Sequence, residues 1–400
     1  MRVLQINAVY EYSSTGRTTR ELHKFLSDKG VDSYVGATNV DGKDDHIIKI
    51  GGSISNKLHG FFSHVFGKQG FYSYFSTLKF LRRVSEIKPD IVHLRVLHSS
   101  FINIPLLLKY LAKNNIPVVI TLHDCWFFTG HCCYFSDSNC DKWQRSCGSC
   151  PDIHNWNASW FFDNSKKNLL AKKNLFQQIE KLAVIGVSDW VTNFVHHSIL
   201  SNSFIIKRIY NWIDIDVFKP LDSNKRRMKL GLNENFVVLC LAQNWGEQKG
   251  INDIFDIAEL RPNYKFVLVG GLTDKYKPLP QNVLSVGVTA NVQELVEYYS
   301  MADVFFNPSR RETFGKVTVE SLSCGTPVVA YNLTATPELV KEGCGFIADF
   351  HDYEQVLMAL DHIAKEGKSS YASRCRKFVV SEFSSNKLMT DYYNLYKSLI

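Results

Sequence analysis

Two glutamates eight residues apart, Glu312 and Glu320, are the side chains in this sequence whose type and spacing most directly suggest chemistry. They lie just before and within a helix that we expect to begin near Phe314 and to end at Gly325. Backbone amides at a helix start lack partners inside the helix and bind phosphate, whereas carboxylates accept hydrogen bonds from sugar hydroxyls. The pattern predicts a ligand site, and two surface glutamates on an amphipathic helix are the alternative.

The elements that must position these glutamates are indicated by apolar, β-rich runs that alternate with helical patterns. That alternation is typical of parallel sheets built from strand-helix-strand units. The predicted strands cover residues 3–9, 33–38, 91–97, 118–122, 183–187 and 205–209, and then 236–241, 266–269, 283–286, 303–306, 328–331 and 345–348. A chain of 400 residues exceeds what one core usually fills, so we expect two doubly wound α/β domains, 1–213 and 214–385.

The sequence from 302 to 331 resembles the Glu-x7-Glu motif of the retaining, nucleotide-sugar-dependent glycosyltransferases of family 4. The resemblance implies the GT-B fold, with two Rossmann-like domains and a cleft between them. It also implies that the segment 386–400 is a helix crossing back to the N-terminal domain, with capping of the second domain as the alternative. By position, Glu312 and the amides after it would hold the transferred sugar, and Glu320 would bind the ribose. The implied donor-binding residues of this stretch are Glu312, Thr313, Phe314, Gly315, Lys316 and Glu320.

Lys249 opens a further predicted helix of the second domain. The resemblance assigns this lysine a catalytic role on the donor diphosphate, where its charge stabilises the bound anion and the leaving group. Many family members carry an arginine a few residues earlier, but this chain has Gln243 and Asn244 there. The candidates for the missing positive charge are Arg310, Arg311 and Lys316. Gly270 fits either a nucleotide-facing loop or a plain strand-end turn.

The first domain carries further candidate residues. A loop through Gly16 is expected after the first strand, with helix from Arg17. The family has a glycine-bearing loop here, which implies close approach of the donor at Gly16 and positive charge from Arg17. His123 ends a buried strand, and a lone histidine is more often a packing residue, but the resemblance implies a catalytic contact with the transferred sugar. Arg95 stands where such relatives commonly have a histidine.

Six of the ten cysteines lie in the segment 125–151, which we interpret as an insertion. One structural Zn²⁺ could be saturated by four thiolates and would order a segment with few apolar residues. The predicted ligands are Cys132, Cys140, Cys147 and Cys150. His131 or Cys133 could replace Cys132, and disulfides or free thiols are the alternatives to zinc. The His-Asp-x-Trp, Thr-Gly-x-Cys and Cys-x2-Cys-Pro pieces resemble a polysaccharide-type subset of family 4.

Residues 57–83 contain no acidic side chain, while five basic residues are interleaved with eight aromatic ones. This mixture suits the anionic inner face of a membrane, and packing of the aromatics in the domain core is the alternative. The overall charge of +7 is too diffuse to indicate nucleic acid. No apolar run approaches the roughly 20 residues of a membrane span, and no signal-peptide pattern is present, so we expect a cytoplasmic protein with peripheral membrane contact.

Together with these features, the resemblance implies a retaining glycosyltransferase that moves a sugar from a nucleoside diphosphate sugar to a glycan or lipid-linked glycan, in surface polysaccharide biosynthesis. No cofactor is expected to be required for catalysis. Front-face attack is implied, in which the departing diphosphate takes the acceptor's proton, so His123 need not act as a general base. The alternatives are a sugar-nucleotide epimerase of GT-B architecture and a degenerate, non-catalytic nucleotide-sugar-binding protein.

Overall fold

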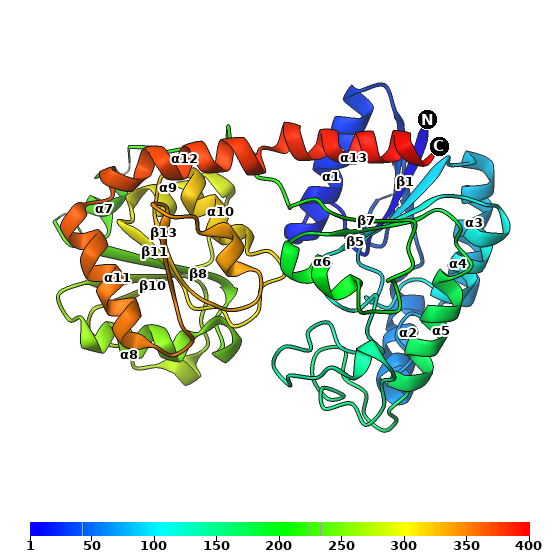
Figure 1. Cartoon of the computed structure of the whole chain (residues 1–400), viewed down its shortest axis with the longest axis horizontal. Helices are drawn as coiled ribbons and strands as arrows, with labels where there is room; N and C mark the ends of the chain where they lie inside the picture. The colour runs from blue at the N-terminus through cyan, green and yellow to red at the C-terminus, as the bar shows by residue number, and fades with distance from the viewer. Residues whose placement is uncertain (42, 223, 233) are drawn as a thin grey trace. The chain divides into compact units, whose positions relative to one another are not determined.

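The computed structural model describes residues 1–41, 43–222, 224–232 and 234–400, which divide into two compact units (Figure 1). The first unit contains Met1–Tyr210 and Met389–Ile400, and the second contains Asn211–Leu388. The first unit's main segment ends at Tyr210, three residues before the domain boundary expected at 213. Ile213 belongs to the second unit because its N–H donates to the Phe383 carbonyl at 2.8 Å and its carbonyl accepts from the Ser385 N–H at 3.1 Å.

The first unit is built on a seven-stranded parallel sheet with the strand order β3-β2-β1-β4-β5-β6-β7. The strands are β1 (Arg2–Ile6), β2 (Asp32–Ala37), β3 (Ile47–Lys49), β4 (Ile91–Leu94), β5 (Val118–Leu122), β6 (Leu182–Gly186) and β7 (Ile205–Arg208). The strand order reverses direction between β1 and β4, which creates a topological switch point. The central strands β4, β5 and β6 are buried along their whole length, as parallel strands between two helix layers must be.

The helices of the first unit are α1 (Ser13–Asp28), α2 (Ser53–Phe66), α3 (Tyr74–Ile87), α4 (Ile104–Lys113), α5 (Ser165–Phe176) and α6 (Asp189–Val195). Side-chain caps mark two of their starts: Asn103 accepts from the Leu106 N–H at 2.9 Å, and Ser188 accepts from the Val191 N–H at 3.2 Å. The segment 125–151 has one short 3-10 helix, η1 (Lys142–Gln144), among its described residues.

The second unit has a six-stranded parallel sheet with the order β10-β9-β8-β11-β12-β13. Its strands are β8 (Val237–Asn244), β9 (Lys265–Gly271), β10 (Val283–Gly287), β11 (Val304–Asn307), β12 (Val328–Tyr331) and β13 (Gly345–Ala348). Its helical elements are α7 (Asn224–Lys229), η2 (Glu247–Lys249), α8 (Ile251–Leu260), η3 (Asp274–Tyr276), α9 (Val292–Met301), α10 (Lys316–Ser323), η4 (Thr336–Leu339), α11 (Tyr353–Glu366) and α12 (Ser369–Phe383). Here the strand order reverses between β8 and β11. Both units are therefore Rossmann-like, as the alternating pattern predicts.

The last helix, α13 (Ser385–Leu399), supplies the first unit with two buried tyrosines from its second half. The Tyr396 hydroxyl lies 2.7 Å from His93 Nδ1, and the Tyr392 hydroxyl lies 2.9 Å from Thr121 Oγ1. Thr121 Oγ1 is in turn 2.8 Å from His93 Nε2. Both nitrogens of His93 are therefore used inside the core of this unit, and burial holds its pKa well below the ordinary value.

Candidate functional site

Lys249 and Glu312 are 63 positions apart in the sequence and meet in the structure of the second unit. Lys249 Nζ lies 2.6 Å from Glu312 Oε1 and donates a second hydrogen bond to Ser309 Oγ at 3.2 Å. The lysine follows β8 and the glutamate follows β11, so both stand beyond the carboxyl ends of the two strands at which the order of this sheet reverses. That position is where open α/β sheets bind their ligands.

Gly250 allows the lysine-bearing turn to approach the loop after β11. Its φ is +70°, and a Cβ at this position would lie 2.5 Å from the Pro308 carbonyl oxygen. The Arg310 N–H also donates to the Gln248 carbonyl at 3.1 Å. A larger residue at 250 would force the two loops apart, so the Lys249–Glu312 contact depends on this glycine.

Helix α10 begins at Lys316, two residues later than the sequence predicts. Gly315 has a φ of +91°, a left-handed conformation that a helix cannot continue through, and it therefore stands as the residue before the first turn. Thr313 and Phe314 are buried, and the Phe314 ring packs against Phe383. What this stretch can offer a ligand is consequently its backbone amides, together with those of the first turn of α10.

Glu320 is placed differently from Glu312. It lies in the second turn of α10 with only 3% of its surface exposed, and Tyr299 of α9 donates a hydrogen bond to its Oε2 at 3.0 Å. A contact with ribose would have to use the remaining lone pairs of this carboxylate. That role stays a prediction.

Gly270 and Arg310, two further donor-side candidates in the second unit, have local structural partners. Gly270 has a φ of +127°, and a Cβ there would overlap the Ala242 carbonyl oxygen at the end of β8. Close packing of two strand ends therefore already requires this glycine. The Arg310 guanidinium lies over the Phe350 ring, 5.3 Å from its centroid, and within 3.4 Å of His351 Nε2. Arg311 and Lys316 are half-buried.

The expected loop at Gly16 is helical, which corrects the sequence-based boundary. Helix α1 begins at Ser13, so Gly16 and Arg17 lie in its first turns. A Cβ on Gly16 would stand 3.2 Å from Val9 Cγ2, and this close packing accounts for the glycine without a ligand. Arg17 is exposed to solvent.

His123 follows β5 and accepts a hydrogen bond from a buried arginine. Arg95 follows β4, is 1% exposed, and places its Nη2 3.0 Å from His123 Nε2. Because a guanidinium only donates, Nε2 must be unprotonated and the ring hydrogen lies on Nδ1. Burial first, and then the charge of Arg95, hold the pKa of His123 well below its ordinary value. His123 is therefore a neutral imidazole.

Arg95 itself stands at the switch point of the first sheet, and no role was predicted for it from the sequence. Its Nη2 also donates to Thr18 Oγ1 at 2.7 Å, and its Nη1 lies 3.4 Å from Gln5 Oε1. The signal available in the sequence was the departure from histidine at this position. Tyr299 and Ser309 were also missed, because their roles depend on contacts across the fold.

The structure identifies a different group of metal-ligating side chains beside the segment 125–151. Among the described residues, the one group of three metal-ligating side chains whose ligand atoms all lie within 4.8 Å of one another is His98, Asp124 and Cys133. The four predicted thiols are near enough to influence one another, and burial raises the pKa of Cys132 and Cys147 and brings that of Cys150 to about 12. Zinc binding by those four thiols stays a prediction.

Part of the aromatic run 57–83 is exposed, which excludes simple core packing for those rings. On α2, Leu58, Phe61, Phe62 and Phe66 are between 39% and 52% exposed. They continue into the segment 160–162, whose three aromatic residues are between 51% and 73% exposed. Ring contacts join the two parts, with centroids 6.1 Å apart for Phe61 and Trp160. Phe80 of α3, in contrast, is buried. Among the described residues, no helix has the length and apolar character to span a membrane.

The curated relatives match parts of the chain. A Klebsiella pneumoniae protein described as an uncharacterized 41.2 kDa protein in the cps region is 28% identical over 48% of this chain and 55% of its own length. The N-acetyl-alpha-D-glucosaminyl L-malate synthase of Bacillus anthracis is 25% identical over 54% of this chain and 60% of its own length. The chain thus spans little more than half of these relatives. WcaC of Escherichia coli K12, named for colanic acid biosynthesis, is 22% identical over 78% of this chain and 77% of its own length.

Solved structures match the whole chain and show its fold. Sucrose-phosphate synthase from Thermosynechococcus elongatus has a TM-score of 0.73 at 17% identity and covers 100% of this chain and 98% of its own. HepE from Anabaena, solved with UDP, has a TM-score of 0.69 at 19% identity and covers 100% of both chains. The two Rossmann-like sheets are thus those of the GT-B fold. The family model for glycosyl transferases group 1 matches residues 222–378, and that for Glycosyltransferase Family 4 matches residues 15–217, more than half of the sequence. The chain therefore belongs to glycosyltransferase family 4.

Proposed function

We propose that the chain is a retaining glycosyltransferase that moves a sugar from a nucleoside diphosphate sugar to a glycan or lipid-linked glycan in surface polysaccharide biosynthesis. The observation that carries the proposal is the Lys249–Glu312 pair at the switch point of the second sheet, directly before the start of α10. Family membership supports it, as do the relatives named for colanic acid biosynthesis and for a cps region. A nucleotide sugar donor is supported by HepE, which was solved with UDP and with UDP-glucose.

In this proposal, donor binding breaks the Lys249–Glu312 ion pair. Lys249 then binds the diphosphate, and Glu312 binds the transferred sugar. Without donor, the charge of Lys249 is offset by Glu312 at 2.6 Å. A diphosphate at the start of α10 would attract both the lysine and the helix amides. Glu312 would then be released to accept hydrogen bonds from the hydroxyls of the transferred sugar. The same lysine stabilises the diphosphate as the bond between the sugar's anomeric carbon and its phosphate oxygen breaks.

In this mechanism His123 is a neutral imidazole that takes no part in proton transfer. Its Nε2 accepts from Arg95 and its Nδ1 carries the hydrogen, so neither ring nitrogen is available to remove the acceptor's proton. The proton instead passes to the departing phosphate oxygen while the acceptor oxygen bonds to the same face of the anomeric carbon. That course gives retention of configuration without a protein nucleophile.

The proposal is tested by incubating the chain with UDP-glucose and other nucleotide sugars, with and without lipid-linked glycan acceptors, and detecting product by mass spectrometry. Glu312→Ala should abolish transfer, whereas Glu259→Ala, an exposed glutamate of α8, should leave transfer unchanged. Transfer that survives Glu312→Ala would refute the site. Turnover of the nucleotide sugar without any acceptor would instead favour an epimerase, and donor binding without turnover would favour a degenerate protein.

We also propose that the aromatic surface formed by Leu58, Phe61, Phe62, Phe66 and residues 160–162 contacts an anionic membrane. Lys57 and Lys166 are exposed beside these two segments, so basic groups flank the apolar rings. Such a combination suits the interface of a bilayer, with rings at the level of the headgroups and lysines facing the acidic lipids. The segment predicted from sequence, 57–83, therefore contains only part of the proposed surface. Residues 160–162 form the other part and come from a different segment of the chain.

Vesicle co-sedimentation tests the membrane contact. The Phe61→Ser/Trp160→Ser variant should bind phosphatidylglycerol vesicles at least about tenfold more weakly than the parent, since each ring contributes about 1.5 to 3 kcal/mol when it is fully buried. Phe204→Ser removes a ring of similar exposure, 60%, that lies outside the surface and serves as the matched control. Equal vesicle binding by the double variant and the parent would contradict the proposal.

A further inference from the structure

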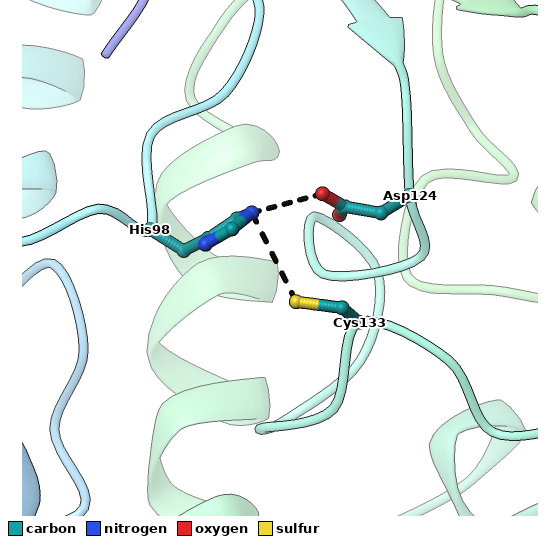
Figure 2. Close-up of side chains that lie close together, drawn as sticks. All are labelled: His98, Asp124 and Cys133. Atoms are coloured by element: carbon teal, nitrogen blue, oxygen red, sulfur yellow. Dashed lines mark hydrogen bonds and ion pairs between the residues drawn. The ribbon is translucent and has the colours of Figure 1, made fainter. Parts of the chain in front are cut away.

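His98, Asp124 and Cys133 converge from three separate segments of the first unit (Figure 2). His98 comes from the loop after β4, Asp124 from the loop after β5, and Cys133 from the cysteine-rich segment. His98 Nε2 is 2.9 Å from Asp124 Oδ2 and 3.9 Å from Cys133 Sγ. The side chains of His98 and Asp124 are 17% and 14% exposed, and Cys133 is 3% exposed.

The way these groups face one another distinguishes the cluster from a nucleophilic triad. In a proton relay, the acid contacts one imidazole nitrogen and the nucleophile contacts the other. Here both the carboxylate and the sulfur approach the same atom, Nε2, as the two dashed lines of Figure 2 show. One N–H cannot donate well to both acceptors. Three ligand atoms that all lie within 4.8 Å of one another could instead bind one metal ion.

We propose that His98, Asp124 and Cys133 bind one divalent transition metal ion of the zinc class. Tetrahedral zinc with these ligands would separate nitrogen from oxygen by about 3.4 Å and nitrogen from sulfur by about 3.5 Å. The present separations of 2.9 and 3.9 Å differ from those values by about half an ångström each. Thiolate and carboxylate together offset the charge of the ion, and imidazole, thiolate and carboxylate are the three ligand types that zinc uses in proteins.

The groups around the three ligands would hold them in place. The Trp126 N–H donates to the other Asp124 oxygen at 2.8 Å, and the Cys125 N–H donates to the Cys133 carbonyl at 2.8 Å. The Asn157 amide nitrogen lies 3.3 Å from His98 Nδ1 and 3.5 Å from Cys133 Sγ. Metal binding at Nε2 moves the ring hydrogen to Nδ1, which the Asn157 oxygen would accept after a half-turn of its amide. The cysteine releases one proton as it binds.

This site differs from the four-thiol site predicted from sequence and does not depend on the proposed function. It contains one sulfur instead of four, and three protein ligands leave a fourth position for water. Asp124 is bonded directly to His123 along the chain. The ion would therefore clamp the loop that carries His123 to the cysteine-rich segment.

Metal content and cobalt spectroscopy test the site on the full chain without a polyhistidine tag. In a Cys147→Ala/Cys150→Ala background, which removes half of the predicted four-thiol set, we expect one Co²⁺ per chain with a sulfur-to-cobalt charge-transfer band. Adding Cys133→Ala should remove the band, and adding His98→Gln should weaken Co²⁺ binding at least about tenfold. Adding Cys240→Ala, a buried cysteine of β8, should change neither.

X-ray absorption of the zinc-loaded parent identifies the atoms bound to zinc without any substitution in the protein. A population of zinc with one sulfur and several nitrogen or oxygen neighbours supports the proposal. Zinc surrounded only by four sulfurs, or no zinc bound after equilibration, overturns it. Co²⁺ binding in the background variant that is unaffected by Cys133→Ala, with the far-ultraviolet circular dichroism unchanged, overturns it as well.

Discussion

Acidification should destabilise the first unit through His59, a buried histidine of α2. Its Nε2 accepts from the Gly70 N–H at 3.3 Å and its Nδ1 lies 2.8 Å from Ser73 Oγ, so the neutral ring with hydrogen on Nδ1 satisfies both contacts. The side chain is 1% exposed, and burial lowers its pKa from 6.5 to about 4. A proton added at Nε2 would face the Gly70 N–H with no acceptor.

The size of the effect follows from the two pKa values. Between pH 6.5 and 4 the unfolded chain takes up a proton at this histidine that the folded chain does not, so the free energy of unfolding falls as the pH falls. Above pH 6.5 the stabilising contribution is fully present. Between about pH 7 and about pH 5 the loss amounts to about 2 kcal/mol.

Urea denaturation followed by tryptophan fluorescence measures this loss, because five of the seven tryptophans lie in the first unit. His59→Gln keeps an acceptor for the Gly70 N–H but cannot be protonated, so its unfolding free energy should fall by about 2 kcal/mol less than that of the parent over the same pH interval. His197→Gln removes an exposed histidine of the same unit and should behave like the parent. Equal pH dependence in His59→Gln and the parent would refute the reasoning.

Three further predictions concern the second unit. Gly250→Ala should lower its free energy of unfolding by about 1 to 3 kcal/mol, because a left-handed φ and a backbone clash oppose the new Cβ, and urea denaturation with an unchanged midpoint would contradict this. Lys249→Met should weaken UDP binding at least about tenfold in isothermal titration calorimetry, since it removes the charge at the proposed diphosphate site, and an unchanged dissociation constant would exclude that role. Tyr299→Phe should lower the free energy of unfolding by about 1 to 2 kcal/mol through loss of the hydrogen bond to buried Glu320, and a neutral result would show that the bond contributes nothing net.

The parallel sheets were predictable because their strands are short apolar runs between helical patterns. The predicted strands 118–122, 328–331 and 345–348 coincide with β5, β12 and β13. The three-residue β3 was missed, since so short a run carries no periodicity. The helix starts at Ser13 and Lys316 were misplaced for opposite reasons. Gly16 is tolerated inside a helix where it packs on Val9, whereas Gly315 adopts a left-handed conformation that ends the preceding loop.

Local sequence motifs predicted which residues belong to the candidate site but not how those residues contact one another. Spacing and family resemblance indicated both Lys249 and Glu312, but their ion pair depends on the close approach at Gly250, which no local pattern encodes. Arg95 and the cluster around His98 depend on the alignment of neighbouring strand ends in a sheet. That alignment follows from strand order, which the sequence pattern leaves open.

The two tyrosines of α13 impose an order of events on the synthesis of this protein. His93 and Thr121 lie on strands that are translated before the second unit, whereas Tyr392 and Tyr396 are translated after it. While the ribosome produces the whole second unit, the first sheet must wait with these buried polar groups lacking their tyrosine partners. We therefore expect the nascent first unit to stay incompletely folded until residues 389–400 have left the ribosome, and to depend on protection from aggregation during that interval.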